Sequence, residues 1–392
     1  MGHVVEFEKN SQEEIRVDLA EVFRGAIRMS LEVMLEEEVK AMVGVERFER
    51  GVGRRGHRNG TYLRGLLTSM GHIELAVPRT RDGSAAGVIG EYKRRTEEVD
   101  AMVTEAYVSG VSQRKMGDVT ETLMGERVSK SVVSRVAKRL GQTVEQLRKE
   151  KLDQKFPYLY LDATFINARW ARRVENVAAL VAYGVGEDGH RHLLGVHIGP
   201  SESEASWTEL LKQLIDRGLA GVMLVISDDH AGLKAAVRHW LPDADHQRCT
   251  VHLQRNVMTK TPRRLQGRVI TEVSEIFKSN SRQLALEKLE EFEARWSKEL
   301  PEAVACLRGG FDAAARFFAY PREHWKRIRT TNSLERLHGE IKRRTKSVGV
   351  FPDRESALRL ITGVAIKTCA RWGDRRYLEM NLLNEKEIEE AA

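Results

Sequence analysis

Apolar residues recur every three or four positions between Arg329 and Pro352, near the C-terminal end of the chain. This spacing predicts an amphipathic helix of about four turns. Asn332 is a favourable N-cap residue, and Gly349 followed by Pro352 supplies the end of the helix. The apolar stripe consists of Leu334, Leu337, Ile341 and Val348. The pattern therefore predicts a helix with one face packed against the rest of the protein.

Charged residues line the border of that stripe. At 100° per residue, Glu335, Lys342 and Lys346 fall within about 40° of one another. A carboxylate above lysines at the edge of a buried face is unusual for a plain surface helix; it is compatible with chemistry on a phosphate, with both lysines and the neighbouring Arg343 as DNA contacts. The alternative is that Glu335 completes a capping box with Asn332 and that the lysines are solvated.

The N-terminal part, residues 1–95, combines a helical pattern with a strand pattern. From about Glu13 to Val43 the apolar spacing is helical, which predicts a helix that packs internally or dimerises. The segment TYLRGLLTSMGHIELAVPR then predicts two short strands joined around Met70 and Gly71. We expect a small β-hairpin in a region that contacts DNA.

Residues 96–150 predict three short helices, over 99–110, 112–125 and 129–141, each ended by glycine. This order is typical of a helix-turn-helix, although any small helical bundle shares it. In the last helix four apolar residues face inward: Val132, Val133, Val136 and Leu140. The residues left to face a major groove are Lys130, Ser131, Ser134, Arg135, Lys138 and Arg139.

From residue 151 to about 260 the pattern changes to strands in the order β-β-β-α-β-α, which predicts a mixed α/β sheet. Asp162 and Asp228 stand at the expected ends of the first and fourth strands, where ligands gather in such folds. Strand alternation from Val222 places Asp228 and its neighbour Asp229 on opposite sides. We therefore assign the chemistry to Asp228, and we expect Asp229 to begin the next helix.

The rest of the chain is predicted to be helical. Residues 261–324 form an all-helical insertion, residues 325–380 supply the closing helices of the core, and 381–392 is a tail. Before the insertion His246, Cys249 and His252 recur every three residues. They lack the matching pair of ligands that a zinc site needs.

Composition adds an electrostatic preference. The chain has 64 Lys+Arg against 57 Asp+Glu, and the segment from 50 to 95 alone carries ten basic residues against three acidic ones. This segment suits a polyanion, and the alternative is a solvated basic loop. Its expected DNA-backbone contacts are Arg54, Arg55, Arg58 and Arg64. Three dispersed cysteines and the lack of a membrane-length apolar run favour a cytoplasmic, nucleoid-associated protein.

Three carboxylates, Asp162, Asp228 and Glu335, predict the chemistry. Oxygen ligands without a complete Cys/His set suit Mg²⁺, or Mn²⁺, and two such ions can drive in-line phosphodiester displacement. We expect the three acids within about 5 Å of one another, close enough to share metals.

Several stretches together resemble a known family, the Mutator-type bacterial insertion-sequence transposases of the DDE class. They are LYLDATF, VISDDHAGL, HQRCTVHLQRNV and HWKRIRTTNSLERLHGEIKRRTKSVGVFP, with GHIELAVPRTRDG and GVSQRKMGDV in the N-terminal half. The resemblance covers about Leu31 to Tyr377. It implies an RNase H-like core with a helical insertion, a catalytic triad of Asp162, Asp228 and Glu335, and a basic residue at Lys342. It also places Cys249 and His252 in a signature near the active site.

The function expected on this basis is binding of terminal inverted repeats, followed by Mg²⁺-dependent cleavage and strand transfer into target DNA. Joining two DNA ends requires a homodimer or a higher oligomer on DNA. Two alternatives stay open: an RNase H-like nuclease or resolvase, which would not need the N-terminal DNA-binding region, and a DNA-binding repressor with a silent core.

Overall fold

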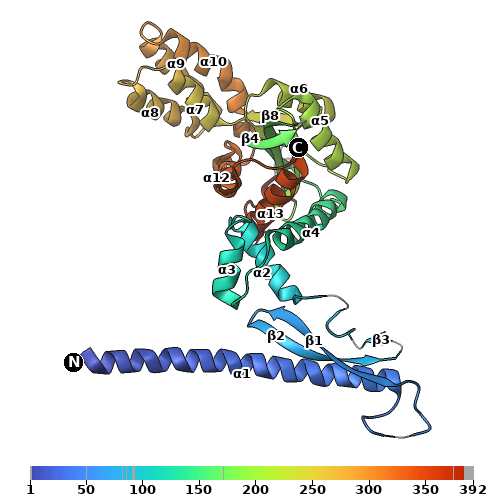
Figure 1. Cartoon of the computed structure of the whole chain (residues 1–392). Helices are drawn as coiled ribbons and strands as arrows, with labels where there is room; N and C mark the ends of the chain where they lie inside the picture. Colours follow the sequence, from blue (N-terminus) through green and yellow to red (C-terminus); the bar gives the residue numbers. More distant parts are fainter. Residues whose placement is uncertain are drawn as a thin grey trace. The chain divides into compact units, whose positions relative to one another are not determined.

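A computed structural model gives the structure of the protein. It describes residues 2–49, 51–81, 83–84, 86–90, 93–170, 172–373 and 375–383, with side chains from residue 19 onward except that of 373. The chain divides into two compact units, Met1–Ala137 and Lys138–Ala392 (Figure 1). The division falls inside a helix, α4 (Lys130–Lys149).

The first unit is built on a long helix and a β-hairpin. Helix α1 (Gly2–Val43) is followed by strands β1 (Arg58–Thr68), β2 (Gly71–Thr80) and β3 (Gly83–Ser84), which form an antiparallel sheet in that order. The turn at Met70 and Gly71 is where the sequence predicts it, and Gly71 has a φ of 116° that favours glycine. Leu35 of α1 packs with Ile73, Leu75 and Val77 of β2 in one core cluster.

Helix α1 has a second apolar stripe that this sheet does not cover. Leu35 and Val39 are buried, whereas Leu19, Val22 and Val33 are more than two-fifths exposed. The exposed stripe consists of Leu19, Val22, Ala26, Met29 and Val33. Their spacing of three and four residues is that of the seam of a coiled coil.

Three helices follow the hairpin region. They are α2 (Glu97–Val108), α3 (Met116–Met124) and α4. The sequence predicts their order and approximate positions, but α4 continues to Lys149 instead of ending at 141, because the glycine at that position does not break the helix. Val133, Val136 and Leu140 are buried, as expected, and Val132 is half-buried.

The second unit contains a five-stranded mixed sheet. Its spatial order is β6-β5-β4-β7-β8, with the first three strands antiparallel and the last three parallel. The strands are β4 (Tyr158–Trp170), β5 (Arg173–Val185), β6 (Arg191–Gly199), β7 (Leu224–Ser227) and β8 (Asp245–Arg248). The predicted α/β class and the order of its first elements are confirmed. Strand β8 was not predicted, because its four residues, DHQR, have no apolar alternation.

Helices cover both faces of this sheet. Helices α5 (Glu204–Asp216) and α6 (Ala231–Trp240) pack on the face that carries Leu159, Leu161 and Val225. Helices α12 (Asn332–Val348) and α13 (Arg354–Gly373) lie on the opposite face. There the Tyr183 hydroxyl bonds Ser333 of α12, and its ring meets Trp372 of α13.

The segment between β8 and α12 is helical, which includes the helices predicted over 261–324 and one before them that was not predicted, α7 (Thr250–Thr259). Its elements are α7, α8 (Gln266–Phe277), α9 (Arg282–Trp296), α10 (Pro301–Ala314), a 3₁₀ turn η1 (Arg316–Ala319) and α11 (Trp325–Ile328). Helix α10 contacts both α7 and β8, so the insertion is anchored at the edge of the sheet. Residues 384–392 of the expected tail lie outside the described residues. No helix in the described ranges has the length and apolar character needed to cross a membrane.

Candidate active site

The sheet register brings the first two acids together. Strand β4 pairs in parallel with β7 through Tyr158 with Leu224 and Tyr160 with Ile226. Extended by two residues, this register brings Asp162 level with Asp228 on the face covered by α12, and the charge of Asp228 acts on the Asp162 carboxyl. Asp162 lies within β4 and not at its end, because β4 extends to Trp170. The parallel pairing with β7, however, stops just before it.

The neighbouring acids after β7 have different surroundings. Asp228 accepts a hydrogen bond from the backbone N–H of His230 at 3.2 Å. Asp229 is instead held by two cations, Lys234 at 2.5 Å and Arg248 at 2.9 Å. The expected role of Asp229 in starting a helix is wrong, since α6 begins at Ala231 with His230 as N-cap. The Asp229 carboxylate thus connects α6, through Lys234, with β8, through Arg248. Asp228 is the acid that faces the site.

Asp162 is buried, and its surroundings disfavour its charge. Burial raises the pKa of its carboxyl to about 7; the positive charge of His252 opposes this, and Asp228 adds to it. Its Oδ2 lies 3.5 Å from Nδ1 of His338, a buried residue of α12. Burial also lowers the pKa of His338 to about 4, so this imidazole is neutral at pH 7. The contact between Asp162 and the neutral His338 is therefore not an ion pair at pH 7.

The third acid, Glu335, lies in the first turn of α12. Leu334, Leu337 and Ile341 are fully buried, so the predicted stripe fixes the orientation of the helix. The carboxylate of Glu335 is bound by both ends of one guanidinium, Arg255 of α7, at 2.5 and 3.1 Å. This pairing contradicts the capping-box alternative.

The N-cap of α12 is also not the predicted residue. The helix begins at Asn332, and its N-cap is Thr331, whose side chain makes no capping bond. Among the residues that the structure describes, no three carboxylate, imidazole or thiolate groups lie close enough to hold a metal ion. The expected approach of all three acids is thus not seen while Glu335 is bound to Arg255.

Cys249 joins the parts of the site. Its backbone N–H donates to the carbonyl of Ser227, the residue before Asp228, at 2.7 Å. Its sulfur accepts from both the N–H and the hydroxyl of Thr331, each at 3.4 Å. The Thr331 carbonyl in turn accepts from the N–H of Glu335 at 3.0 Å. One buried cysteine therefore links the strand of Asp228 to the helix of Glu335.

His252, three residues after Cys249, is a cation among the acids. The adjacent Cys249 sulfur raises the pKa of His252 to about 9, against burial, with help from Asp162 and Asp228. Burial raises the pKa of the Cys249 thiol, but hydrogen bonding from His252 and Thr331 outweighs burial and the pKa is lowered. Nε2 of His252 is 3.6 Å from Glu335. His246 bonds the Ser227 hydroxyl instead.

Three residues of this site were missed by sequence reasoning. Glu202, just before α5, has a side chain only 12% exposed, and its Oε1 is 3.9 Å from His230 Nδ1. Burial and then the charge of Asp228 raise its pKa. His338 and Arg255 were also missed, although each stands three residues after a predicted site residue on a helix, a spacing that puts it on the same face. No local signal marks Glu202.

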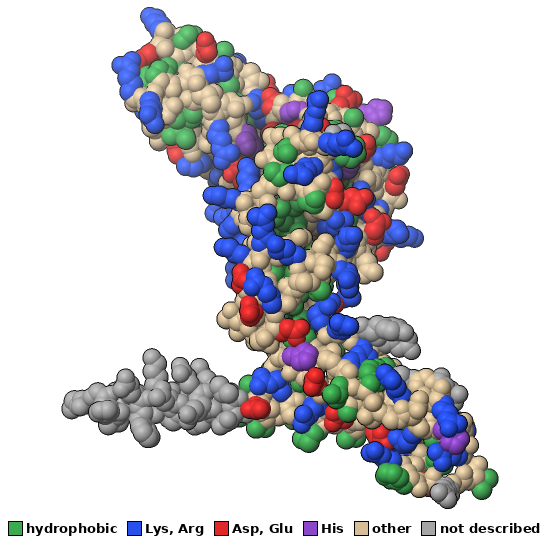
Figure 2. All heavy atoms as spheres, viewed as in Figure 1, with side chains coloured by type: hydrophobic (Ala, Val, Ile, Leu, Met, Phe, Trp, Pro, Cys, Tyr) green, Lys and Arg blue, Asp and Glu red, His purple; other side chains and the backbone are tan. Residues whose placement is uncertain are grey.

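The predicted DNA-contact residues of the helices are mostly exposed. On α12, Lys342 and Lys346 are exposed, and Arg343 pairs with Glu340. On α4 all six predicted residues are exposed except Ser134, which is half-buried. Figure 2 shows lysine and arginine side chains spread over the visible surface of both units and interspersed with acids. Their exposure leaves these side chains accessible to DNA.

The arginines predicted around the hairpin are occupied within the chain. Arg54 Nε donates to the carbonyl of Gly56, and Arg55 Nη2 donates to that of Ala41. Arg58 pairs with Glu36 of α1. Arg64 donates to the carbonyls of Gly90 and Lys93. These contacts tie loops to α1 and the hairpin, a role that charge counting along the sequence does not reveal.

Comparison with known proteins places the chain in a family. The family described as "Transposase, Mutator family" matches residues 2–374. The chain is 37% identical over 364 residues to the transposase for insertion sequence element ISRM5 of Rhizobium meliloti (strain 1021), covering 92% of each chain. It is 36% identical over 358 residues to the transposase for insertion sequence element IS256 in transposon Tn4001 of Staphylococcus aureus, covering 89% of this chain and 90% of the relative.

A mycobacterial relative extends the match to nearly the whole chain. The transposase for insertion sequence element IS1081 of Mycobacterium tuberculosis (strain ATCC 25618 / H37Rv) is 33% identical over 387 residues, which is 97% of this chain and 93% of the relative. The chain belongs to the Mutator family of transposases.

Proposed function

We propose that this transposase is a DDE enzyme with an RNase H-like core, in which Asp162, Asp228 and Glu335 carry out phosphodiester cleavage and strand transfer. The observation that carries the proposal is the β4–β7 register, which sets Asp162 beside Asp228 on the sheet face covered by the helix of Glu335. The strand order, three antiparallel strands continued by two parallel ones, supports the core assignment.

The donor set fits Mg²⁺, or Mn²⁺, in part. The oxygens of Asp162 and Asp228 are the hard ligands that these ions prefer. Two bound ions would supply Lewis-acid activation of the attacking hydroxyl and stabilisation of the leaving oxygen. Arg255 now binds both oxygens of Glu335 and therefore competes with a metal ion for them.

The remaining residues position DNA and balance charge. The protonated His252 offsets the acids, and Lys342, exposed one helical turn beyond His338, is available to hold a phosphate as a point charge. The N-terminal helices and hairpin bind the terminal inverted repeats, with α4 presenting its polar face to the major groove.

The active form on DNA is at least a homodimer, because two ends must be joined. The exposed stripe of α1 supports this part of the proposal, since its spacing suits a coiled coil with a second copy of the chain.

Cleavage and strand transfer on labelled duplexes that carry the flanking inverted repeat, with Mg²⁺ or EDTA, test the proposal. Asp228→Asn loses at least about 100-fold in cleavage rate, as removal of a metal-binding carboxylate should. Asp229→Asn is the matched control, because its carboxylate pairs with Lys234 and Arg248 and not with the site. If Asp228→Asn kept its activity and Asp229→Asn lost it, the catalytic aspartate would be Asp229 and not Asp228. A wild type that binds the repeat but never cuts it would instead identify a repressor.

A further inference from the structure

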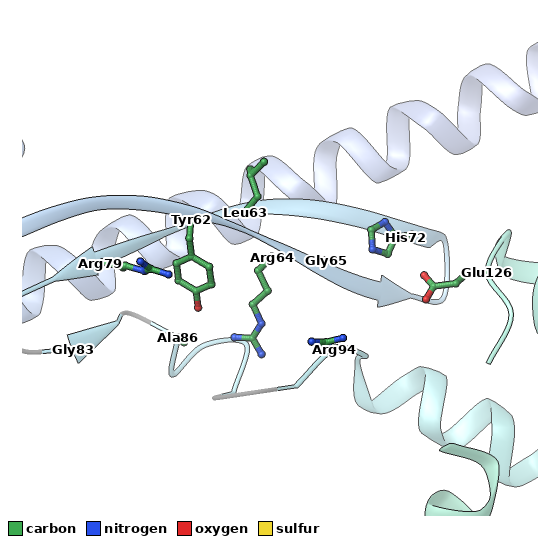
Figure 3. A pocket seen from close by; sticks show the side chains of 10 residues that line it. All are labelled: Tyr62, Leu63, Arg64, Gly65, His72, Arg79, Gly83, Ala86, Arg94 and Glu126. Carbon is green, nitrogen blue, oxygen red and sulfur yellow. The ribbon is translucent and has the colours of Figure 1, made fainter. Parts of the chain in front are cut away.

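A hollow of about 980 Å³ lies against the hairpin of the first unit. Its lining includes Tyr62, Arg64 and Arg79 from the hairpin, Arg94 from the segment before α2, and His72 with Glu126 at one end (Figure 3). Three arginines against one carboxylate make the lining basic. The composition of the lining therefore points to an anionic ligand.

One of the three arginines serves as part of the wall. Arg64 Nη2 donates to the carbonyl of Gly90 at 2.9 Å and also to that of Lys93. These bonds hold the backbone at Gly90 and at Lys93 beside β1. The N–H of Leu67 donates to the carbonyl of Arg94 at 2.9 Å, which fixes the residue after Lys93 as well. The position of Arg94 is therefore set by the backbone before any ligand binds.

The other two arginines have unused donors. Arg79 and Arg94 are both exposed, and within the described part of the chain neither guanidinium has an acidic or carbonyl partner. The Arg79 guanidinium stacks on the half-buried Tyr62 ring, 4.4 Å from its centroid. Stacking restrains the guanidinium while leaving its N–H groups free to bind in the plane. Both arginines thus have donors in place for an incoming anion.

We propose that this hollow binds backbone phosphates of duplex DNA, one through Arg79 and one through Arg94. Guanidinium N–H groups match phosphate oxygens in a two-point geometry, and a restrained donor loses less freedom on binding. The inference rests on the proposed function, which requires the first unit to hold DNA. It moves the contact away from Arg54, Arg55 and Arg58, each of which already uses one guanidinium nitrogen to bind within the chain.

The salt dependence of DNA binding by the full-length chain tests this site. Affinity for a duplex carrying the inverted repeat is measured by fluorescence anisotropy at several salt concentrations, in EDTA so that no cleavage occurs. The slope of log K against log[salt] becomes shallower by about 0.9 for each phosphate that the protein no longer neutralises. Arg79→Gln and Arg94→Gln each reduce the slope by about 0.9, and the double variant by about 1.8. Because phosphates carry no sequence information, a scrambled duplex shows the same change.

The matched control removes two other arginines of the same unit. Arg28 and Arg47 are exposed, and Arg47 lies over the Phe48 ring at 5.3 Å, as Arg79 lies over Tyr62. The double variant Arg28→Gln/Arg47→Gln loses the same charge and should keep the wild-type slope. An equal change of the salt slope in both double variants, or no change in Arg79→Gln/Arg94→Gln, would overturn the proposal that the hollow binds phosphates. If wild type still cleaves in Mg²⁺ in that case, the proposed function stands and only the hollow is excluded.

Discussion

Replacing Cys249 by alanine removes the acceptor that ties Thr331, at the start of α12, to the sheet. The Cys249 sulfur and Thr331 are both fully buried, and the sulfur accepts from the Thr331 N–H and hydroxyl at 3.4 Å. The hydroxyl can rotate towards another acceptor, but the backbone N–H cannot. Alanine therefore leaves at least one buried donor without a partner at the N-cap of the helix that carries Glu335.

An unsatisfied buried donor costs about 1–3 kcal/mol, and the space left by the sulfur costs about 1 kcal/mol more. We expect Cys249→Ala to lower the free energy of unfolding by about 2–4 kcal/mol. Cys249→Ser keeps an oxygen that can accept the same bonds, so it should lose about half as much. Cys369→Ala is the matched control, because Cys369 is also buried, in α13 and away from these contacts. It should lose only the packing part, about 1 kcal/mol.

Urea unfolding of the three variants measures the stability, and cleavage of the repeat duplex is measured well below the melting temperature. If Cys249 positions the helix of Glu335, Cys249→Ala loses about 10- to 100-fold in cleavage rate while folded, as loss of a residue that orients a metal ligand typically does. Cys249→Ser should recover most of that rate. Equal stability and equal activity of Cys249→Ala and Cys369→Ala would refute the reasoning and reduce Cys249 to a packing residue.

Two further perturbations test the charges of the site. The pKa of Asp162 is about 7 in the folded chain against an ordinary 3.8, so its ionisation destabilises the fold progressively from about pH 4 to 7, by on the order of 4 kcal/mol in total. The urea concentration at the unfolding midpoint should therefore be higher for Asp162→Asn than for wild type at pH 8 in EDTA, and similar for the two proteins at about pH 4.5. Asp153→Asn, at an exposed position, serves as the control. If the stability of Asp162→Asn and of wild type changed in parallel with pH, the raised pKa of Asp162 would be contradicted. Arg255→Gln frees Glu335 from an ion pair worth up to about 1 kcal/mol, since Arg255 is 57% exposed, and should lower the Mg²⁺ needed for half-maximal cleavage up to about fivefold. Arg264→Gln, which breaks a comparable pair with Glu299 in the insertion, should leave the Mg²⁺ requirement unchanged, and an unchanged requirement in Arg255→Gln would show that the pair does not restrain Glu335.

Local periodicity was a reliable guide wherever an element has one buried face. The helix of Glu335, the hairpin around Gly71 and the β-β-β-α-β-α order all follow from apolar spacing, because burial of one face imposes a period on the sequence. The limits of elements were less predictable. Helix α4 passes through its internal glycine, and β4 continues eight residues past Asp162, since tertiary packing outweighs the preferences of single residues.

Strand alternation distinguished Asp228 from Asp229 in sequence, and the structure gives the two acids different partners. The reason for the difference lies far along the chain. Arg248, which binds Asp229, belongs to a strand that sequence patterning did not find. The same holds for Glu202, whose burial beside Asp228 depends on how the loop before α5 packs.

The sequence by itself determined the α/β class, the transposase family, the faces of the main helices and the identity of the acids that we assign to chemistry. Only the tertiary structure decided that Arg255 holds Glu335, that Cys249 bonds Thr331, and that the arginines at 54, 55, 58 and 64 have acidic or carbonyl partners, whereas within the described residues the guanidinium groups of Arg79 and Arg94 have none. The physical reason is the range of the interactions. Periodicity records burial within one element, whereas Arg255 and Glu335 are 80 residues apart and meet only when the insertion folds back onto the sheet.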